Sequence, residues 1–328
     1  MSGARLRAVR HGAEYLMTRA LEAGVRILPH PVAHRAGAGA AALAYGRLRI
    51  RREVVEGNLR IAFPERSDHW RAETARASYV HLAREALATV RLSHLDPAGI
   101  RERTDFTGWE EIRAAHALGR GVILLTGHFG NWEMGAAAVA ARGVPVHGIV
   151  RRQSNLRVDR RFAAMRRRFG VGTIDAGDAT RPVTRGLRAG HVLGFVGDQD
   201  ARGAGIWVPF FARWTSTYRG AAVFALRKDV PVFFCACRRL PGSRPRYRVE
   251  TNPLAVPRTG NLETDTRRLT EAFSRSLEEV VRRHPEQYFW VHRRWKTPPP
   301  PELAAVTAGT SAGAARPGTD SPATGHGS

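Results

Sequence analysis

The sequence has 328 residues, of which 43% are hydrophobic and 8% aromatic, so the chain can bury a large core and is not an unfolded tail. Fifty-two Lys and Arg residues against 29 Asp and Glu give a formal net charge of +23, and only Lys228 and Lys296 are lysines. Neither lysine lies in the Gly-rich frame of a P-loop, which excludes that class of nucleotide-binding site.

The first hundred residues have a helical pattern without a convincing strand. In residues 14–28, apolar positions such as Leu16 and Ile27 share one helical face, and Arg19 and Arg26 share another. A helix of this kind either lies on a membrane surface or packs on its own domain, and the pattern leaves both open. Arginines interrupt the region before the roughly 18 apolar residues that a spanning helix needs, so no transmembrane segment is expected.

From Gly121 onward, short apolar runs alternate with amphipathic helical patterns, which is typical of an α/β fold. The apolar runs predict strands over 121–127, 145–150, 191–197 and 231–237. Helices are predicted over about 70–92, 132–142, 155–169, 180–189, 217–228 and 262–283.

These patterns predict three parts along the chain. Residues 1–104 form a helical, membrane-associating region, residues 105–297 form an α/β domain, and residues 298–328 form a disordered tail. The tail consists mainly of Pro, Ala, Gly, Ser and Thr, which cannot bury a core.

Residues 151–168 contain eight arginines and one acidic residue. They form either a solvated helix face or an anion-binding surface, because so many like charges repel one another unless something negative is close. The segment also leaves open a function other than catalysis. In that case the chain would be a basic, non-enzymatic protein that binds anionic membranes or nucleic acid through these arginines. The sequence has no aromatic stacking motif or groove-reading module, so nucleic acid is not an expected partner.

The segment GVILLTGHFGNWEMG, residues 121–135, has the pattern of a buried strand, a glycine-flanked turn and a helix that begins near Asn131. His128 and Glu133 therefore come together at the carboxyl end of a strand, where open α/β sheets bind ligands. A carboxylate on one ring nitrogen would fix the imidazole tautomer and leave the other nitrogen to take a proton from a hydroxyl. The alternative is a histidine that only satisfies a helix-capping turn.

This turn contains no serine or cysteine. A His–Glu pair without a nucleophile of its own points to direct attack by a substrate hydroxyl on an activated acyl group. Acyl transfer is therefore the leading reaction class.

Several ordered blocks extend the pattern over residues 14–298. They are EGNLRIAFPE (56–65), GHFGNWE (127–133), VGDQDARGAGIWVPFF (196–211) and HPEQYFWVHRRWKTPP (284–299). With these blocks the chain resembles the lipid A biosynthesis lauroyl/myristoyl acyltransferases, a family that also includes phosphatidylinositol mannoside acyltransferases.

The resemblance implies a glycerol-phosphate-acyltransferase-like αβα sandwich with a mostly parallel central sheet. It makes His128 the catalytic base and Glu133 the residue that orients it. The donor would be an acyl thioester on acyl carrier protein or coenzyme A. The acceptor would be a hydroxyl of a membrane glycolipid, a lipid A precursor or another such as a phosphatidylinositol mannoside, at the cytoplasmic face of the bacterial inner membrane. No metal and no resident cofactor are expected.

Other residues of the blocks are candidates for substrate binding. Asp198, Gln199 and Asp200 close the strand 191–197 at the sheet end of His128, so they either hold the acceptor, together with Asn131, or cap the loop. No histidine clusters with them at a metal-ligand spacing.

Four arginines and three aromatic residues complete the predicted site. Arg151, Arg152, Arg293 and Arg294 suit bidentate contacts to phosphates of the substrates, or pair with acidic residues of the chain. Trp207, Phe210 and Phe211 line an acyl groove or belong to the core.

Two departures from the family pattern bear on the expected function. The N-terminal region is less hydrophobic than the anchor of many relatives, so peripheral attachment to the membrane is expected rather than insertion. Glu133 stands where the mannoside-acylating relatives typically carry Asp, which favours a lipid A type of acceptor.

Overall fold

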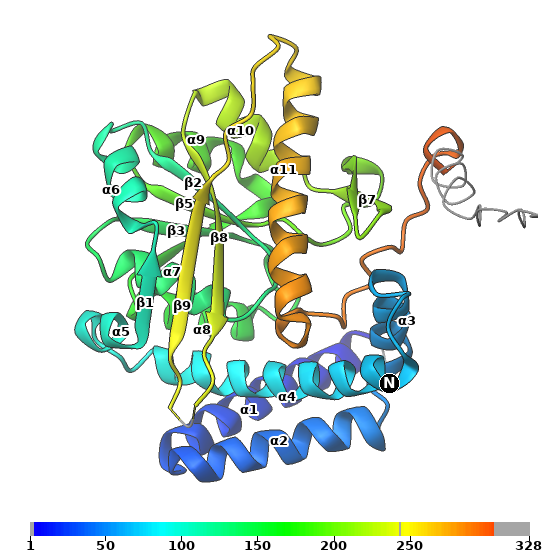
Figure 1. The fold of residues 1–328 in the computed structure, drawn as a ribbon. Coiled ribbons are helices and arrows are strands. Elements are labelled where there is room, and N and C mark those ends of the chain that lie inside the picture. Colours follow the sequence, from blue (N-terminus) through cyan, green and yellow to red (C-terminus); the bar gives the residue numbers. More distant parts are fainter. Residues whose placement is uncertain (1–2, 243, 305–328) are drawn as a thin grey trace, which may run out of the picture.

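A seven-stranded sheet forms the centre of the computed structural model, which describes residues 3–242 and 244–304 (Figure 1). The strands are β1 (Thr104–Thr107), β2 (Val122–Thr126), β3 (Val146–Val150), β4 (Val171–Asp175), β5 (Val192–Val196), β8 (Val232–Arg239) and β9 (Tyr247–Pro253). They lie in the order β1-β9-β8-β2-β5-β3-β4. The five strands from β8 to β4 are parallel, whereas β9 pairs antiparallel with β8 and carries β1 at the sheet edge.

Helices cover both faces of this sheet. They are α5 (Pro97–Arg103), α6 (Trp109–Ala117), α7 (Trp132–Ala140), α8 (Leu156–Arg168), α9 (Thr180–Arg188), α10 (Gly220–Lys228) and α11 (Leu262–Arg283). Alternate residues of β2 point to opposite faces. Ile123 and Leu125 pack in one core with residues of α9, α10 and α11, while Val122 and Leu124 pack in a second core with residues of α6, α7 and α8. The predicted α/β fold with a mostly parallel sheet is therefore confirmed.

The N-terminal helical region is also confirmed. Its helices are α1 (Gly3–Ile27), α2 (His30–Gly46), α3 (Arg52–Ala62) and α4 (Asp68–Leu92). In Figure 1, α4 crosses below the sheet, next to the end at which β8 finishes. A contact between Glu85 of α4 and Arg239, the last residue of β8, fixes this placement. Helix α4 thus lies at the end of the sheet where β8 and the strands parallel to it finish.

The surface of α1 carries many exposed apolar side chains. They include Leu6, Val9, Leu16, Met17 and Ile27, which are 63 to 81% exposed. Within residues 3–242 and 244–304, none of the helices combines the length and the apolarity needed to cross a membrane.

Four predicted strands and six predicted helices are present close to their expected bounds, but five strands were not predicted. Besides β1, β4 and β9, they include the hairpin of β6 (Ile206–Phe210) and β7 (Arg213–Thr217). The helix expected from residue 217 begins at Gly220, because Thr217 belongs to β7. Of the predicted disordered tail, residues 298–304 are described and end in a helical turn over 301–304, whereas residues 305–328 lie outside the described residues.

Candidate active site

The turn that follows β2, residues 127–131, is called the His128 turn below. Asn131 caps α7 as predicted, since its side-chain oxygen accepts a hydrogen bond of 2.8 Å from the Met134 amide. Gly130 has φ +57°, and a Cβ atom there would overlap the carbonyl oxygen of Cys237 on β8. The turn therefore requires glycine at this position, where the backbone of β8 approaches it closely.

The C-terminal segment, residues 284–297, holds the same turn by backbone hydrogen bonds. The Gly130 amide donates to the Gln287 carbonyl at 2.9 Å, and the Phe289 amide donates to the His128 carbonyl at 2.9 Å. Gln287 ends the short 3-10 helix η3 (Pro285–Gln287). The HPEQYF block of the sequence thus lies against the His128 turn.

The carboxylate that bonds to the His128 imidazole is that of Asp198. Nδ1 of His128 lies 2.6 Å from Oδ1 of Asp198, and the His128 backbone amide donates to Oδ2 at 2.9 Å. Both residues follow the ends of paired parallel strands, since Thr126 of β2 lies opposite Val196 of β5. Adjacent strand ends therefore bring together two residues that are 70 positions apart.

Asp198 is 3% exposed. Burial alone would raise the pKa of this carboxyl group, but the charge of His128 and the hydrogen bonds from it bring the pKa down to about 2. Asp198 is thus an ionised, buried acceptor for the imidazole.

The other ring nitrogen of His128 contacts Gln199. Nε2 lies 3.3 Å from Nε2 of Gln199, and the His128 side chain is 19% exposed. Because Asp198 binds Nδ1–H, Nε2 carries the lone pair and accepts from the Gln199 amide. Trp132 and Phe289 enclose the ring, with centroids 4.9 and 5.5 Å from it. An imidazole held in this way, with Nδ1 bonded to a carboxylate, can take a proton from a hydroxyl group at Nε2.

The expected pairing of His128 with Glu133 is wrong. Glu133 lies in the first turn of α7 and its carboxylate binds Arg166 of α8, whose Nε is 3.0 Å from both oxygens. Both side chains are largely buried. The cause is that α7 starts at Trp132, directly after the turn, and directs Glu133 toward α8 rather than back to the ring.

The remaining polar residues of the predicted site have internal partners. Asp200 is buried, with Oδ2 accepting from Thr297 at 2.8 Å and the backbone amide donating to His292 Nε2 at 2.9 Å. Asn131 is 2% exposed and donates to Glu85 at 2.8 Å, so the expected contact of Asn131 with substrate is wrong. Of the three residues 198–200, Gln199 is the one that is not buried.

Arg294 is likewise not a phosphate-binding residue. It is 3% exposed and donates to Thr215 Oγ1, Thr217 Oγ1 and the Ser216 carbonyl, all on β7, at 2.6 to 2.9 Å. Burial lowers the pKa of its guanidinium group. Arg294 therefore fastens the C-terminal segment to the β6–β7 hairpin.

The other three arginines lie on the surface. Arg151 and Arg152 follow the end of β3, where Arg152 is 3.3 Å from Asp175, and Arg293 is exposed next to Arg294. Their expected contacts with phosphates remain a prediction.

Two of the three aromatic residues expected in an acyl groove belong to the core. Phe210 and Phe211 are 1% and 3% exposed, and Phe210 stacks on Trp295 with ring centroids 5.8 Å apart. The prediction that these two residues line an acyl groove is therefore wrong. Trp207 on β6 is partly exposed, and its role remains a prediction.

Sequence analysis did not identify Trp132 and Phe289 as part of the site. Both stand inside the family-like blocks GHFGNWE and HPEQYFWVHRRWKTPP, which was the available signal. In the part of the chain that the structure describes, no group of three or more His, Cys, Asp or Glu side chains could hold a metal ion.

Comparison with known proteins adds independent evidence. The sequence profile of the bacterial lipid A biosynthesis acyltransferase family matches residues 4–297. The lipid A biosynthesis lauroyltransferase of Escherichia coli is 27% identical over 274 residues, which cover 83% of this chain and 88% of that protein. The lipid A biosynthesis myristoyltransferase of Escherichia coli is 27% identical over 292 residues, which cover 86% of each chain.

A more limited similarity connects the chain to a different glycolipid enzyme. The phosphatidylinositol mannoside acyltransferase of Mycolicibacterium smegmatis is 26% identical over 165 residues, 49% of this chain and 53% of that protein. The family profile, by contrast, spans the N-terminal helices, the whole sheet and the C-terminal segment against the His128 turn. The chain therefore belongs to the bacterial lipid A biosynthesis acyltransferase family and is an enzyme that transfers acyl groups.

Proposed function

We propose that this enzyme moves a fatty acyl chain from an acyl thioester to a hydroxyl of a lipid A precursor, with His128 as the general base and Asp198 as the carboxylate that orients it. The contact of 2.6 Å between His128 Nδ1 and Asp198 Oδ1 carries the proposal. That contact leaves Nε2 as the basic nitrogen of a side chain that is 19% exposed.

The reaction needs one proton acceptor and no nucleophile of the protein. Nε2 of His128 removes the proton of the acceptor hydroxyl while the oxygen attacks the thioester carbonyl, and a tetrahedral intermediate forms. The C–S bond then breaks, and the imidazolium returns its proton to the thiolate that leaves. The Asp198 carboxylate stabilises the imidazolium between these steps.

The names of the relatives support the choice of substrates. Relatives that align along most of the chain are named lipid A lauroyltransferase and myristoyltransferase, which favours a lipid A precursor as acceptor. A thioester on acyl carrier protein is the proposed donor, with an acyl-CoA as the alternative. The similarity to a phosphatidylinositol mannoside acyltransferase supports a second candidate acceptor of that class.

Peripheral attachment to the cytoplasmic face of the inner membrane completes the proposal. Leu16 and Met17 of α1 are 68% and 70% exposed, and Ile27 is 81% exposed. An amphipathic helix with such side chains and nearby arginines can bury its apolar atoms among lipid acyl chains while the arginines contact anionic headgroups. This placement would bring the site to the lipid that carries the acceptor hydroxyl.

The test is acyl transfer by the purified full-length chain. Labelled acyl carrier protein thioesters, or acyl-CoA in a parallel reaction, are incubated with total lipid of the source cells, and the product is identified by its mass. His128→Ala should lower the rate by about 10²- to 10⁴-fold, the usual contribution of a general base.

His69→Ala is the matched control for this experiment. His69 also lies beside a carboxylate, with Nε2 3.2 Å from Glu73, but its side chain is 80% exposed on α4. We expect this variant to keep normal activity. A His128→Ala protein that acylates the same lipid at the normal rate would refute the proposed mechanism, and acylation of a mannosylated phosphoinositide alone would replace the proposed acceptor.

A further inference from the structure

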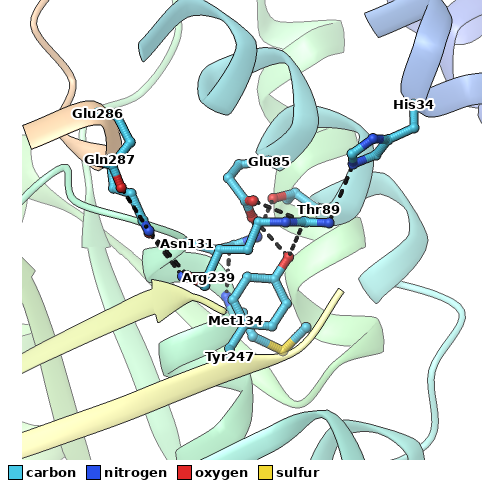
Figure 2. Close-up of polar contacts among 9 residues, drawn as sticks. All are labelled: His34, Glu85, Thr89, Asn131, Met134, Arg239, Tyr247, Glu286 and Gln287. Atoms are coloured by element: carbon cyan, nitrogen blue, oxygen red, sulfur yellow. Dashed lines mark hydrogen bonds and ion pairs between the residues drawn. The ribbon is translucent and has the colours of Figure 1, made fainter. Parts of the chain in front are cut away.

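A buried polar cluster joins the N-terminal helices to the His128 turn (Figure 2). Its centre is the carboxylate of Glu85 on α4, which is 6% exposed. Around it lie Arg239 from the end of β8, Tyr247 from the start of β9 and Asn131 from the His128 turn, none more than 7% exposed. A charged group buried to this extent is costly unless every oxygen has a partner.

Glu85 meets this requirement with three donors. Oε2 accepts from Asn131 Nδ2 and from the Tyr247 hydroxyl, both at 2.8 Å, and Oε1 accepts from Arg239 Nη1 at 3.1 Å. Burial, followed by the nearby charge of Glu85, raises the pKa of Tyr247 well above its usual value, so the phenol remains a donor. The position of the carboxylate is therefore fixed from three sides.

The amide of Asn131 is used at both of its ends. Its oxygen caps α7 through the Met134 amide, and its nitrogen donates to Glu85. If this amide rotated by half a turn, its NH2 group would face the Met134 N–H and the cap would be lost. Glu85 therefore determines which end of the amide faces α7.

Arg239 links the cluster to the same turn by a second route. Its backbone amide donates to Gln287 Oε1 at 2.9 Å, and Gln287 Nε2 donates back to the Arg239 carbonyl at 3.1 Å. The Gln287 carbonyl in turn accepts from the Gly130 amide. Figure 2 also shows Arg239 extending to His34 of α2, with Nη2 and Nε2 3.3 Å apart.

We propose that Glu85 is a positioning residue of the acyl transfer reaction, which holds Asn131 and thereby places the His128 imidazole for proton removal. The inference rests on the proposed role of His128 as the base. Asn131 follows His128 by three residues along one turn, so a shift of Asn131 moves the ring relative to Asp198 and to the acceptor. A displacement of about 1 Å at a reacting group can lower a rate by roughly 100-fold.

The first test variant is Asn131→Asp in the full-length enzyme. The new carboxylate still caps α7 but sets a second acceptor against Glu85. We expect kcat to fall at least about tenfold, while KM for the acyl donor changes less than about twofold, because the affected step follows binding. If Asn131 had a purely structural role, the variant would contain less folded enzyme, and kcat per folded enzyme would stay unchanged.

The double variant Glu85→Gln/Asn131→Asp restores a donor and an acceptor with their places exchanged. The amide introduced on α4 can then donate one hydrogen to the carboxylate introduced in the His128 turn and the other to the Tyr247 oxygen, while the oxygen of that amide faces Arg239. We expect this variant to recover most of the kcat lost in Asn131→Asp. Glu85→Asp, which draws the carboxylate back by one methylene group, is the milder second variant and should lower kcat with a smaller change in Tm.

Asn155→Asp is the matched control. Asn155 is also a buried N-cap, with Oδ1 accepting from the Arg157 amide at 3.2 Å and Nδ2 donating to Glu14 of α1 at 3.0 Å. The same change therefore places two carboxylates together at a helix start outside the His128 turn. We expect Tm to fall and kcat, per folded enzyme, to stay within about twofold of the original value.

His128→Ala in the same assay separates the two proposals. An inactive His128→Ala enzyme together with unchanged kcat in Asn131→Asp and Glu85→Asp would overturn the role of Glu85 alone. A folded double variant no more active than Asn131→Asp would also overturn it. An active His128→Ala enzyme would instead refute the general-base mechanism on which the inference rests.

Discussion

At the scale of single residues, the identity of the carboxylate beside His128 depends on the register of two strands. Glu133 is five positions away in the sequence but lies on a helix that directs it to Arg166. Asp198 is 70 positions away but follows the strand paired with β2. Sequence reasoning placed His128 and Asp198 at the same sheet end. It took Glu133 as the partner and Asp198 as a residue that holds the acceptor or caps the loop, because local spacing does not reveal the order of the strands.

Glu85 had a signal in the sequence that was not used. It lies seven residues after Ser78 and seven before Leu92, both buried positions of α4. A charged residue on the buried face of an amphipathic helix requires partners of its own, and this pattern was visible before the structure. The identities of those partners, on β8 and in the His128 turn, required the tertiary fold.

The structural role of Arg294, which joins the C-terminal segment to the β6–β7 hairpin, can be tested by substitution. Arg294→Ala should lower the free energy of unfolding by about 3 kcal/mol, because the hydroxyl and carbonyl groups of residues 215–217 lose a buried donor. Denaturation in urea measures the change. Arg293→Ala, at the exposed neighbouring position, should change the same quantity by less than about 0.5 kcal/mol. Equal stability of the two variants would contradict the structural role of Arg294.

At the scale of elements, the predictable strands are the central ones. β8 is buried almost throughout and reads as a continuous apolar run, as expected for a strand covered on both faces. β9 alternates buried and partly exposed residues, and β4 at the sheet edge has one buried residue. Their sequences, YRVETNP and VGTID, contain polar residues and were not recognised. The β6–β7 hairpin was not predicted, because glycines and charged residues precede it.

Membrane attachment through helix α1 can be tested by substitutions on its exposed surface. Leu16→Glu combined with Met17→Glu should weaken sedimentation with vesicles of anionic lipid at least about tenfold, because both side chains are exposed and available to the bilayer. Leu118→Glu, at a side chain 61% exposed just after α6, should leave vesicle binding unchanged. Equal binding by the α1 variant and the original chain would contradict membrane attachment through this helix.

At the scale of the whole molecule, the sequence did not indicate where the N-terminal helices pack. Their patterns predicted helices. The structure places α4 across the end of the sheet at which the parallel strands finish, next to the His128 turn (Figure 1). No local pattern encodes this placement, because it depends on contacts such as Glu85–Arg239 between residues 154 positions apart.

Stability should depend on pH through several histidines of the described part of the chain. Burial lowers the pKa of His81, His94, His147, His284 and His292 below the usual 6.5. The unfolded chain then binds more protons than the folded one as the pH falls through about 6.5, so the free energy of unfolding decreases in that range. Asp198 acts in the same direction at lower pH, since its stabilisation is present above its usual pKa of 3.8 and is lost as the pH approaches 2.

Urea denaturation at pH 7.5, 6.5 and 5.5 measures this dependence. The midpoint concentration should be lowest at pH 5.5 and highest at pH 7.5. A midpoint that is constant or rises toward acid would contradict the assignment of these histidines as neutral in the folded protein.

The function of His128 as a general base depends on Asp198, rather than Glu133, as its partner. The direct measurement is kcat for acyl transfer by folded Asp198→Asn and Glu133→Gln enzymes in one assay. We expect Asp198→Asn to lose about 10²- to 10⁴-fold, because an amide does not stabilise the imidazolium, and Glu133→Gln to retain at least about tenfold more activity than Asp198→Asn. Near-normal activity of Asp198→Asn beside an inactive Glu133→Gln would contradict the account.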